Sequence, residues 1–264
     1  MNNRVYAPLS SVLFLAICFI YGSGFYQLVQ SSVLLTLLLT LVFPIVFWPL
    51  IKKVDNDDEI KRILFLETGF NLLCFLAISH WIQVGLIDKG LVVFFLFQAG
   101  GFIFVQLKKQ ATMSALISLC LAAAIAYWII ESTQTQLKGD GALLLFGQAV
   151  PWQLKVIYGA WLAQLLLVEY RYVLPKLTLM SCHIASYFIA IHADDFFHAR
   201  IITASHLLFL ALCFDFKSMD WGGRQFATST MMQQFVSKSS VQHALSASLL
   251  AIALSSLGTL LLFH

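Results

Sequence analysis

The densest group of side chains that could do chemistry begins at His192 and reads His-Ala-Asp-Asp-Phe-Phe-His. Asp194 and His198 are spaced i, i+4, and Asp195 and His198 are spaced i, i+3. A helix that begins at either aspartate would present carboxyl and imidazole groups on one face. That aspartate would also cap the helix N-terminus. His80 ends another apolar run at the same expected membrane level.

Three interpretations of this outer group stay open. It could hold a divalent metal such as zinc, iron or manganese, and that candidate metal site comprises His80, His192, Asp194, Asp195 and His198. It could admit protons or ions to a path. It could also be a polar turn in which acids cap a helix and histidines lie at the headgroups. No motif assigns catalytic residues.

A second pair of candidates lies deeper in the expected membrane. His183 comes 12 residues before Asp195 and His206 comes 11 after it, on two neighbouring apolar runs. At 1.5 Å per residue both lie ~17 Å from the turn. This candidate cofactor pair could bind a b-type haem, pass a proton or simply bond together. Haem is disfavoured against the other two, and a divalent metal elsewhere remains the other cofactor considered.

Polar residues inside membranes are expensive and therefore candidates for function. Glu67 shares a helix face with Asn71 and Cys74, at i+4 and i+7, and this stripe is expected to face the interior. The full set of residues expected to line a path is Glu67, Asn71, Gln98, Gln164 and Glu169.

The composition sets the class of protein that must position these groups. Of 264 residues, 60% are hydrophobic and only 11% are charged, whereas soluble domains carry about 25% charged residues. This excludes a soluble enzyme, a disordered chain and a nucleic-acid-binding domain. The sequence predicts an all-α, polytopic membrane helix bundle that forms a single integral-membrane domain over residues 1–264.

About nine transmembrane helices are expected, because each needs ~20 mostly apolar residues. The predicted spans are 8–29, 32–51, 63–84, 88–107, 111–131, 153–172, 175–193, 198–215 and 243–263. With the N-terminus inside and the C-terminus outside, 12 of the 16 basic residues fall on the inner side. That distribution follows the positive-inside rule and favours a prokaryotic inner membrane.

Two loops have some length. The outer loop, 132–152, carries an apolar stretch from Ala142 to Phe146 that is expected to dip into the interface. The inner loop, 216–242, is expected to hold a short interfacial helix near Phe226 to Phe235. The five cysteines lie in apolar runs without a CxxC pair and are expected to be buried, reduced packing residues.

Three classes of function fit these features. We expect a transporter or channel for an ion or small solute, with a path lined by His, Asp and Glu. The alternatives are a metal-dependent enzyme, embedded in the membrane, acting on a lipid-like substrate at the outer face, and a non-catalytic subunit of a membrane complex. The expected partner is the lipid bilayer, with room for membrane-protein partners or a homo-oligomer and no role for nucleic acid.

Overall fold

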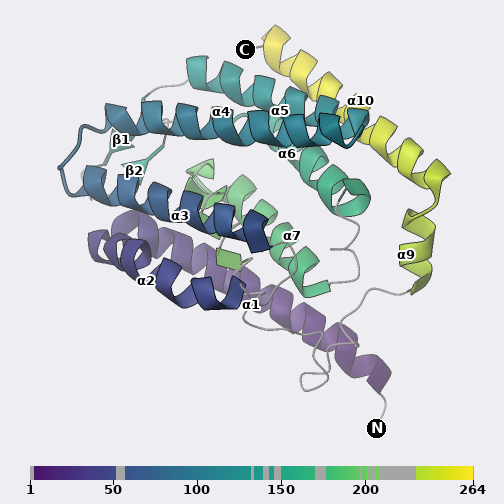
Figure 1. The fold of residues 1–264 in the computed structure, drawn as a ribbon, viewed down its shortest axis with the longest axis horizontal. Helices are drawn as coiled ribbons and strands as arrows, with labels where there is room; N and C mark the ends of the chain where they lie inside the picture. Colours follow the sequence, from purple (N-terminus) through teal and green to yellow (C-terminus); the bar gives the residue numbers. More distant parts are fainter. Residues whose placement is uncertain are drawn as a thin grey trace. The chain divides into compact units, whose positions relative to one another are not determined.

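The computed structural model is helical almost throughout and contains one small pair of strands (Figure 1). It describes residues 3–51, 57–131, 134–138, 143–145, 150–169, 177–196, 198–200, 202–203, 206–207 and 230–263. The all-α prediction is therefore confirmed. The chain divides into two compact units: unit 1 is Met1–Lys89, Gln134–Gln148 and Ser181–Phe226, and unit 2 is Gly90–Thr133, Ala149–Met180 and Ala227–His264.

Unit 1 is a set of helices closed by a short hairpin. Its elements are α1 (Asn3–Ser31), α2 (Val33–Ile51), α3 (Asp57–Ile78), most of α7 (Leu177–His192), and strands β1 (Gln136–Leu137) and β2 (Leu143–Leu144). The strands are antiparallel, with Gln136 opposite Leu144 and Leu137 opposite Leu143. Helix α2 packs along α3.

A serine pair separates α1 from α2. The Ser32 hydroxyl accepts a hydrogen bond from the Leu35 amide at 3.2 Å, as an N-cap residue does. Segments Leu15–Val29 and Val33–Pro49 consequently meet at an angle of 112°. Because of this bend, the pair amounts to one broken span or a re-entrant loop.

Helices α1 and α7 run parallel. The Sγ atoms of Cys18 and Cys182 lie 3.8 Å apart, and further along both helices the Tyr26 hydroxyl donates to the Asp195 carbonyl at 3.4 Å. Both thiols are buried and free. These contacts fix the register of α1 against the elements that carry the buried polar residues described below.

Gly22 provides the close approach between these helices. A Cβ atom at this position would lie 2.6 Å from Cδ1 of Ile189 and 3.5 Å from Cδ1 of Leu207. We expect Gly22→Leu to destabilise the protein by about 1–3 kcal/mol, as overpacking does, measured by thermal unfolding in detergent. Gly24→Leu is the control, because nothing lies within 4 Å of its added Cβ. Equal melting temperatures for the two variants would contradict this packing.

Unit 2 is a helix bundle in which α10 lies beside α5 (Figure 1) and packs against α6 as well. Helix α5 also packs against α6. The elements are the greater part of α4 (Gly85–Lys108), α5 (Thr112–Glu131), α6 (Trp152–Gln164), the π-helical turn η1 (Leu165–Glu169), α9 (Thr230–Val236) and α10 (Ser239–Phe263).

Three helices of the described chain are long and apolar enough to cross a membrane, namely α4, α5 and α10. The bent pair of α1 and α2 raises the number to four at most, so nine spans are not supported. Helices α6 and α7 have 13 and 16 residues, short of the ~20 that a span requires. Only Leu64–Ile78 of α3 is apolar, because the turns before it are charged.

The surface of α4 suits contact with lipid. Leu96, Phe97 and Phe104 are 64%, 78% and 67% exposed, and an exposed apolar face of this kind is typical of helices in a bilayer. These features are those of an integral membrane protein.

The two long loops take different forms. Part of the outer loop folds into the β1–β2 hairpin, which buries Leu143 and Leu145. A short helix, α9, occurs near the C-terminal end of the inner loop and exposes Met231 and Phe235. The rest of the inner loop up to residue 229, and most of the span predicted at 198–215, lie outside the described residues.

Candidate functional site

A group of buried polar residues in unit 1 lies on two facing elements, and we call it the polar seam. Helix α3 contributes one side, and the segment after α7 contributes the other. The members are Glu67, Asn71 and Cys74 on α3, and Asp195, His198, Thr203 and His206 on the second element. All seven side chains are between 0% and 4% exposed. In a membrane protein, burying a group of polar and ionisable side chains costs free energy.

The helical repeat places the α3 residues on one stripe. Glu67, Asn71 and Cys74 follow each other at spacings of four and three residues, which is the spacing of one helix face. Over these seven residues the stripe extends for ~10 Å. The structure buries the whole stripe, in line with the interior position expected for it.

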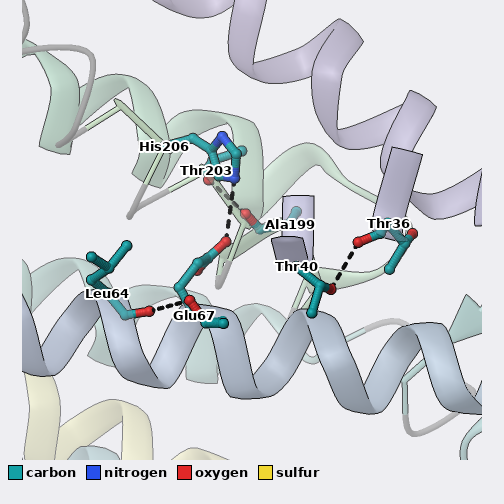
Figure 2. A network of polar contacts seen from close by, with 8 residues as sticks. Thr36, Thr40, Leu64, Glu67, Ala199, Thr203 and His206 are labelled. Carbon is teal, nitrogen blue, oxygen red and sulfur yellow. Dashed lines mark hydrogen bonds and ion pairs between the residues drawn. The ribbon is translucent and has the colours of Figure 1, made fainter. Parts of the chain in front are cut away.

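The closest contact across the seam joins Glu67 and His206. Oε1 of Glu67 lies 3.3 Å from Nε2 of His206, and the side chains are only 2% and 3% exposed (Figure 2). The ring of Phe25 covers the imidazole, with ring centroids 4.6 Å apart. An acid and an imidazole are thus held together away from bulk water, in an arrangement that can bind and release protons.

His198 occupies the other end of the seam. Its ring meets the rings of Phe70 and Tyr26 edge-on, at centroid distances of 5.7 and 5.8 Å. The backbone of Leu143 lies against it, but neither ring nitrogen makes a hydrogen bond of normal geometry with a described residue. The ring is fully buried.

Asn71, one turn after Glu67 on α3, is also fully buried. Neither the oxygen nor the nitrogen of its carboxamide has a hydrogen-bond partner among the described residues. Buried carboxamides normally bond to protein or to ordered water. Asn71 therefore marks a position in the seam that is suited to bind a small polar species.

Two aspartates hold the β1–β2 hairpin in place within unit 1 by hydrogen bonds. The Asp195 carboxyl accepts hydrogen bonds from the amide of Leu145 at 2.6 Å and from the amide of His198 at 2.9 Å. Asp88 accepts from the amide of Thr135, at 3.2 and 3.3 Å to its two oxygens, and from its hydroxyl. The hairpin therefore lies against the His198 end of the seam.

The residues of the predicted metal site are not gathered into one site. His80, His192 and Asp194 are exposed, whereas Asp195 and His198 are buried. Nδ1 of His192 lies 2.8 Å from the Phe188 carbonyl. No group of three or more His, Cys, Asp and Glu residues in the described chain could hold a metal ion.

The two residues of the candidate cofactor pair lie on different elements. His206 turns its Nε2 toward Glu67, whereas His183 lies half-buried on α7. A haem iron bound at Nε2 of His206 would have to displace Glu67. The arrangement therefore fits an acid–imidazole contact better than an axial haem ligand.

Three of the residues predicted to line a path belong to unit 2. Gln98 is exposed on α4. Gln164 is buried and donates to Ser114 at 2.9 Å and to Ser246 at 3.1 Å, which joins α6 to α5 and α10. Glu169 accepts from the Gln106 amide at 2.7 Å. Such bonds hold membrane helices together, so the structure favours a packing role for Gln164 and Glu169.

Gln164→Leu tests that packing role. The variant loses both serine bonds, and interhelical hydrogen bonds in membranes contribute about 0.6–2 kcal/mol each. We expect a lower melting temperature in detergent and unchanged transport in liposomes. A loss of transport without a loss of stability would instead place Gln164 on a path.

Some parts of the site were missed by sequence reasoning. Thr203, whose hydroxyl lies 3.3 Å from that of Ser186 on α7, carried no motif. The anchoring of the hairpin by Asp195 joins residues 50 positions apart. Asp195 itself was recognisable, because an aspartate before a helix predicts a cap.

Comparisons of the chain with protein-family models, with curated proteins and with solved structures found no match. The fold and the seam define the class of protein: a helical protein with three described helices long and apolar enough to cross a membrane and a buried acid–imidazole contact within unit 1.

Proposed function

We propose that the protein is a membrane transporter or channel whose path follows the polar seam of unit 1. The single observation that carries this proposal is the contact between Glu67 and His206, buried at 2% and 3% exposure. Burying ionisable groups costs several kcal/mol each, and pairing often repays only part of that cost, so ionisable groups retained inside membrane proteins commonly serve a function. A path for ions would explain why these groups are retained despite the free-energy cost of burying them.

The charge of the seam favours a cation. Its seven residues include two carboxyl groups and two imidazoles, and neither lysine nor arginine. Carboxyl and imidazole groups attract cations and exchange protons, whereas a path for anions would be expected to carry lysine or arginine. The proposal therefore concerns a cation, with small polar solutes as the wider class.

We propose that the membrane is a prokaryotic inner membrane and that the N-terminus faces the cytoplasm. The inward count of 12 of the 16 basic residues belongs to the nine-span topology, which the described helices do not support, so the orientation is a proposal to be tested by labelling of single cysteines from each side. The bilayer is the partner that this proposal requires, and other membrane proteins or a second copy could bind the apolar helix faces.

The test is flux through the purified full-length chain in liposomes. The panel comprises protons, sodium, potassium, chloride and a set of amino acids and sugars, each driven by an imposed gradient. The expected result is flux of at least one cation above that of protein-free liposomes. Flux no greater than that of protein-free liposomes for the whole panel contradicts the proposal.

A further inference from the structure

We infer that the cation carried along the polar seam is the proton, and that Glu67 and His206 are the groups that bind it. This inference rests on the proposed function and names its substrate. The first support is geometric: Oε1 of Glu67 and Nε2 of His206 are 3.3 Å apart. Protons pass between heavy atoms at about 2.6–3.2 Å, or through one water, so at 3.3 Å transfer requires a small approach of the two side chains or one bridging water.

The transfer step is balanced within the pair. When His206 is protonated, its Nε2–H bond breaks, the electron pair of that bond remains on nitrogen, and an O–H bond forms at Oε1 of Glu67. An imidazolium and a carboxylate become a neutral imidazole and a carboxylic acid. The pair has no net charge before or after the step, which suits a buried site because no isolated charge is created.

The second support is the row of groups that continues from the pair. Asn71 follows Glu67 by one turn of α3, ~6 Å along the axis, and His198 precedes His206 by eight residues in the sequence. A carboxamide and an imidazole can each donate and accept hydrogen bonds. The Asn71 carboxamide makes no hydrogen bond with a described residue, whereas the backbone of Leu143 lies against the His198 ring. Asn71 is therefore suited to bind water that passes a proton along the seam.

Among the described residues of unit 1, the buried polar and ionisable groups include no lysine. Cys74 of α3 lies within electrostatic range of both Glu67 and Asp195. Helix α1 contributes Tyr26 and Cys18, α2 contributes the hydroxyls of Thr36 and Thr40 (Figure 2), and α7 contributes Ser186 and Cys182. The segment that carries His206 adds Asp195, His198 and the partly exposed Arg200. The acids in this environment favour a cationic passenger.

The experiment measures proton flux with a pH-sensitive dye trapped in liposomes that contain the full chain. A potassium gradient with valinomycin supplies the driving potential, and sodium flux is recorded separately with a sodium-sensitive dye. We expect proton flux above protein-free liposomes, reduced about tenfold or more in His206→Gln. His243→Gln is the matched control, because His243 is exposed and its ring contacts Ser239 of its own helix. We expect its flux to equal the wild type.

Each outcome separates the two proposals. Sodium or solute flux without proton flux overturns the inference and leaves the proposed function standing. No flux of any kind overturns both. Proton flux that His206→Gln leaves unchanged shows that the proton takes another route. If His206→Gln does not fold, Glu67→Asp is measured instead. This variant keeps the carboxyl group but moves it farther from His206, so flux equal to the wild type contradicts the inference.

Discussion

Replacing Glu67 with glutamine is expected to reduce cation flux by about a hundredfold, the lower end of what a positioned acid or base contributes to proton movement. Glutamine keeps the volume of the side chain and removes the group that binds a cation. Oε1 of Glu67 is the atom that faces His206 at 3.3 Å, so the substitution puts an amide in place of the acid at the His206 end of the seam. The measurement is initial flux in liposomes at equal protein content.

Glu131→Gln is the control for this prediction. Glu131 ends α5 and is exposed, so the same chemical change is made outside the seam. We expect wild-type flux from this variant. If Glu67→Gln conducted as well as Glu131→Gln, the acid would have no part in the path.

Replacing Asp195 with alanine is expected to release the β1–β2 hairpin. Its carboxyl accepts from the amides of Leu145 and His198 at 2.6 and 2.9 Å. Hydrogen bonds to charged groups contribute about 1.5–3 kcal/mol each, and both would be lost. The expected results are a lower melting temperature in detergent and faster hydrogen exchange at the Leu145 amide.

Asp194→Ala is the matched control, because the neighbouring Asp194 is exposed. We expect this variant to melt with the wild type and to leave exchange in the hairpin unchanged. Equal behaviour of the two alanine variants would show that Asp195 does not hold the hairpin.

The apolar helices could be predicted from the sequence because a chain in lipid must satisfy its backbone hydrogen bonds internally. The spans expected at 88–107, 111–131 and 243–263 correspond to α4, α5 and α10. The number of membrane-spanning helices could not be predicted, since a hydropathy pattern does not show where two successive apolar helices are bent against each other. The break at Ser32 turns two predicted spans into one bent pair.

The stripe on α3 was also predictable, because Glu67 and Asn71 follow the helical period. The role of Asp195 was predictable only in part. The spacing indicated a cap and a metal ligand, and the structure uses the carboxyl for two backbone amides. Asp194 is exposed whereas His198 is buried, so their i, i+4 spacing does not bring the two side chains to one site.

Long-range contacts explain the rest. His183 and His206 lie at similar distances from Asp195 along the sequence, but this spacing does not indicate in which direction either side chain points. Packing turns His206 toward α3. The hairpin likewise depends on Asp195, 50 residues after Leu145. Contacts of this separation leave no periodic signal in the sequence.

The most direct test of the central claim is a double-mutant cycle on flux. Glu67→Gln, His206→Gln and the double variant are compared with the wild type in liposomes. If the two residues act as one site, the double variant is expected to conduct no worse than the more impaired single variant. Losses that multiply in the double variant would show that Glu67 and His206 act independently, and would contradict a shared site in the polar seam.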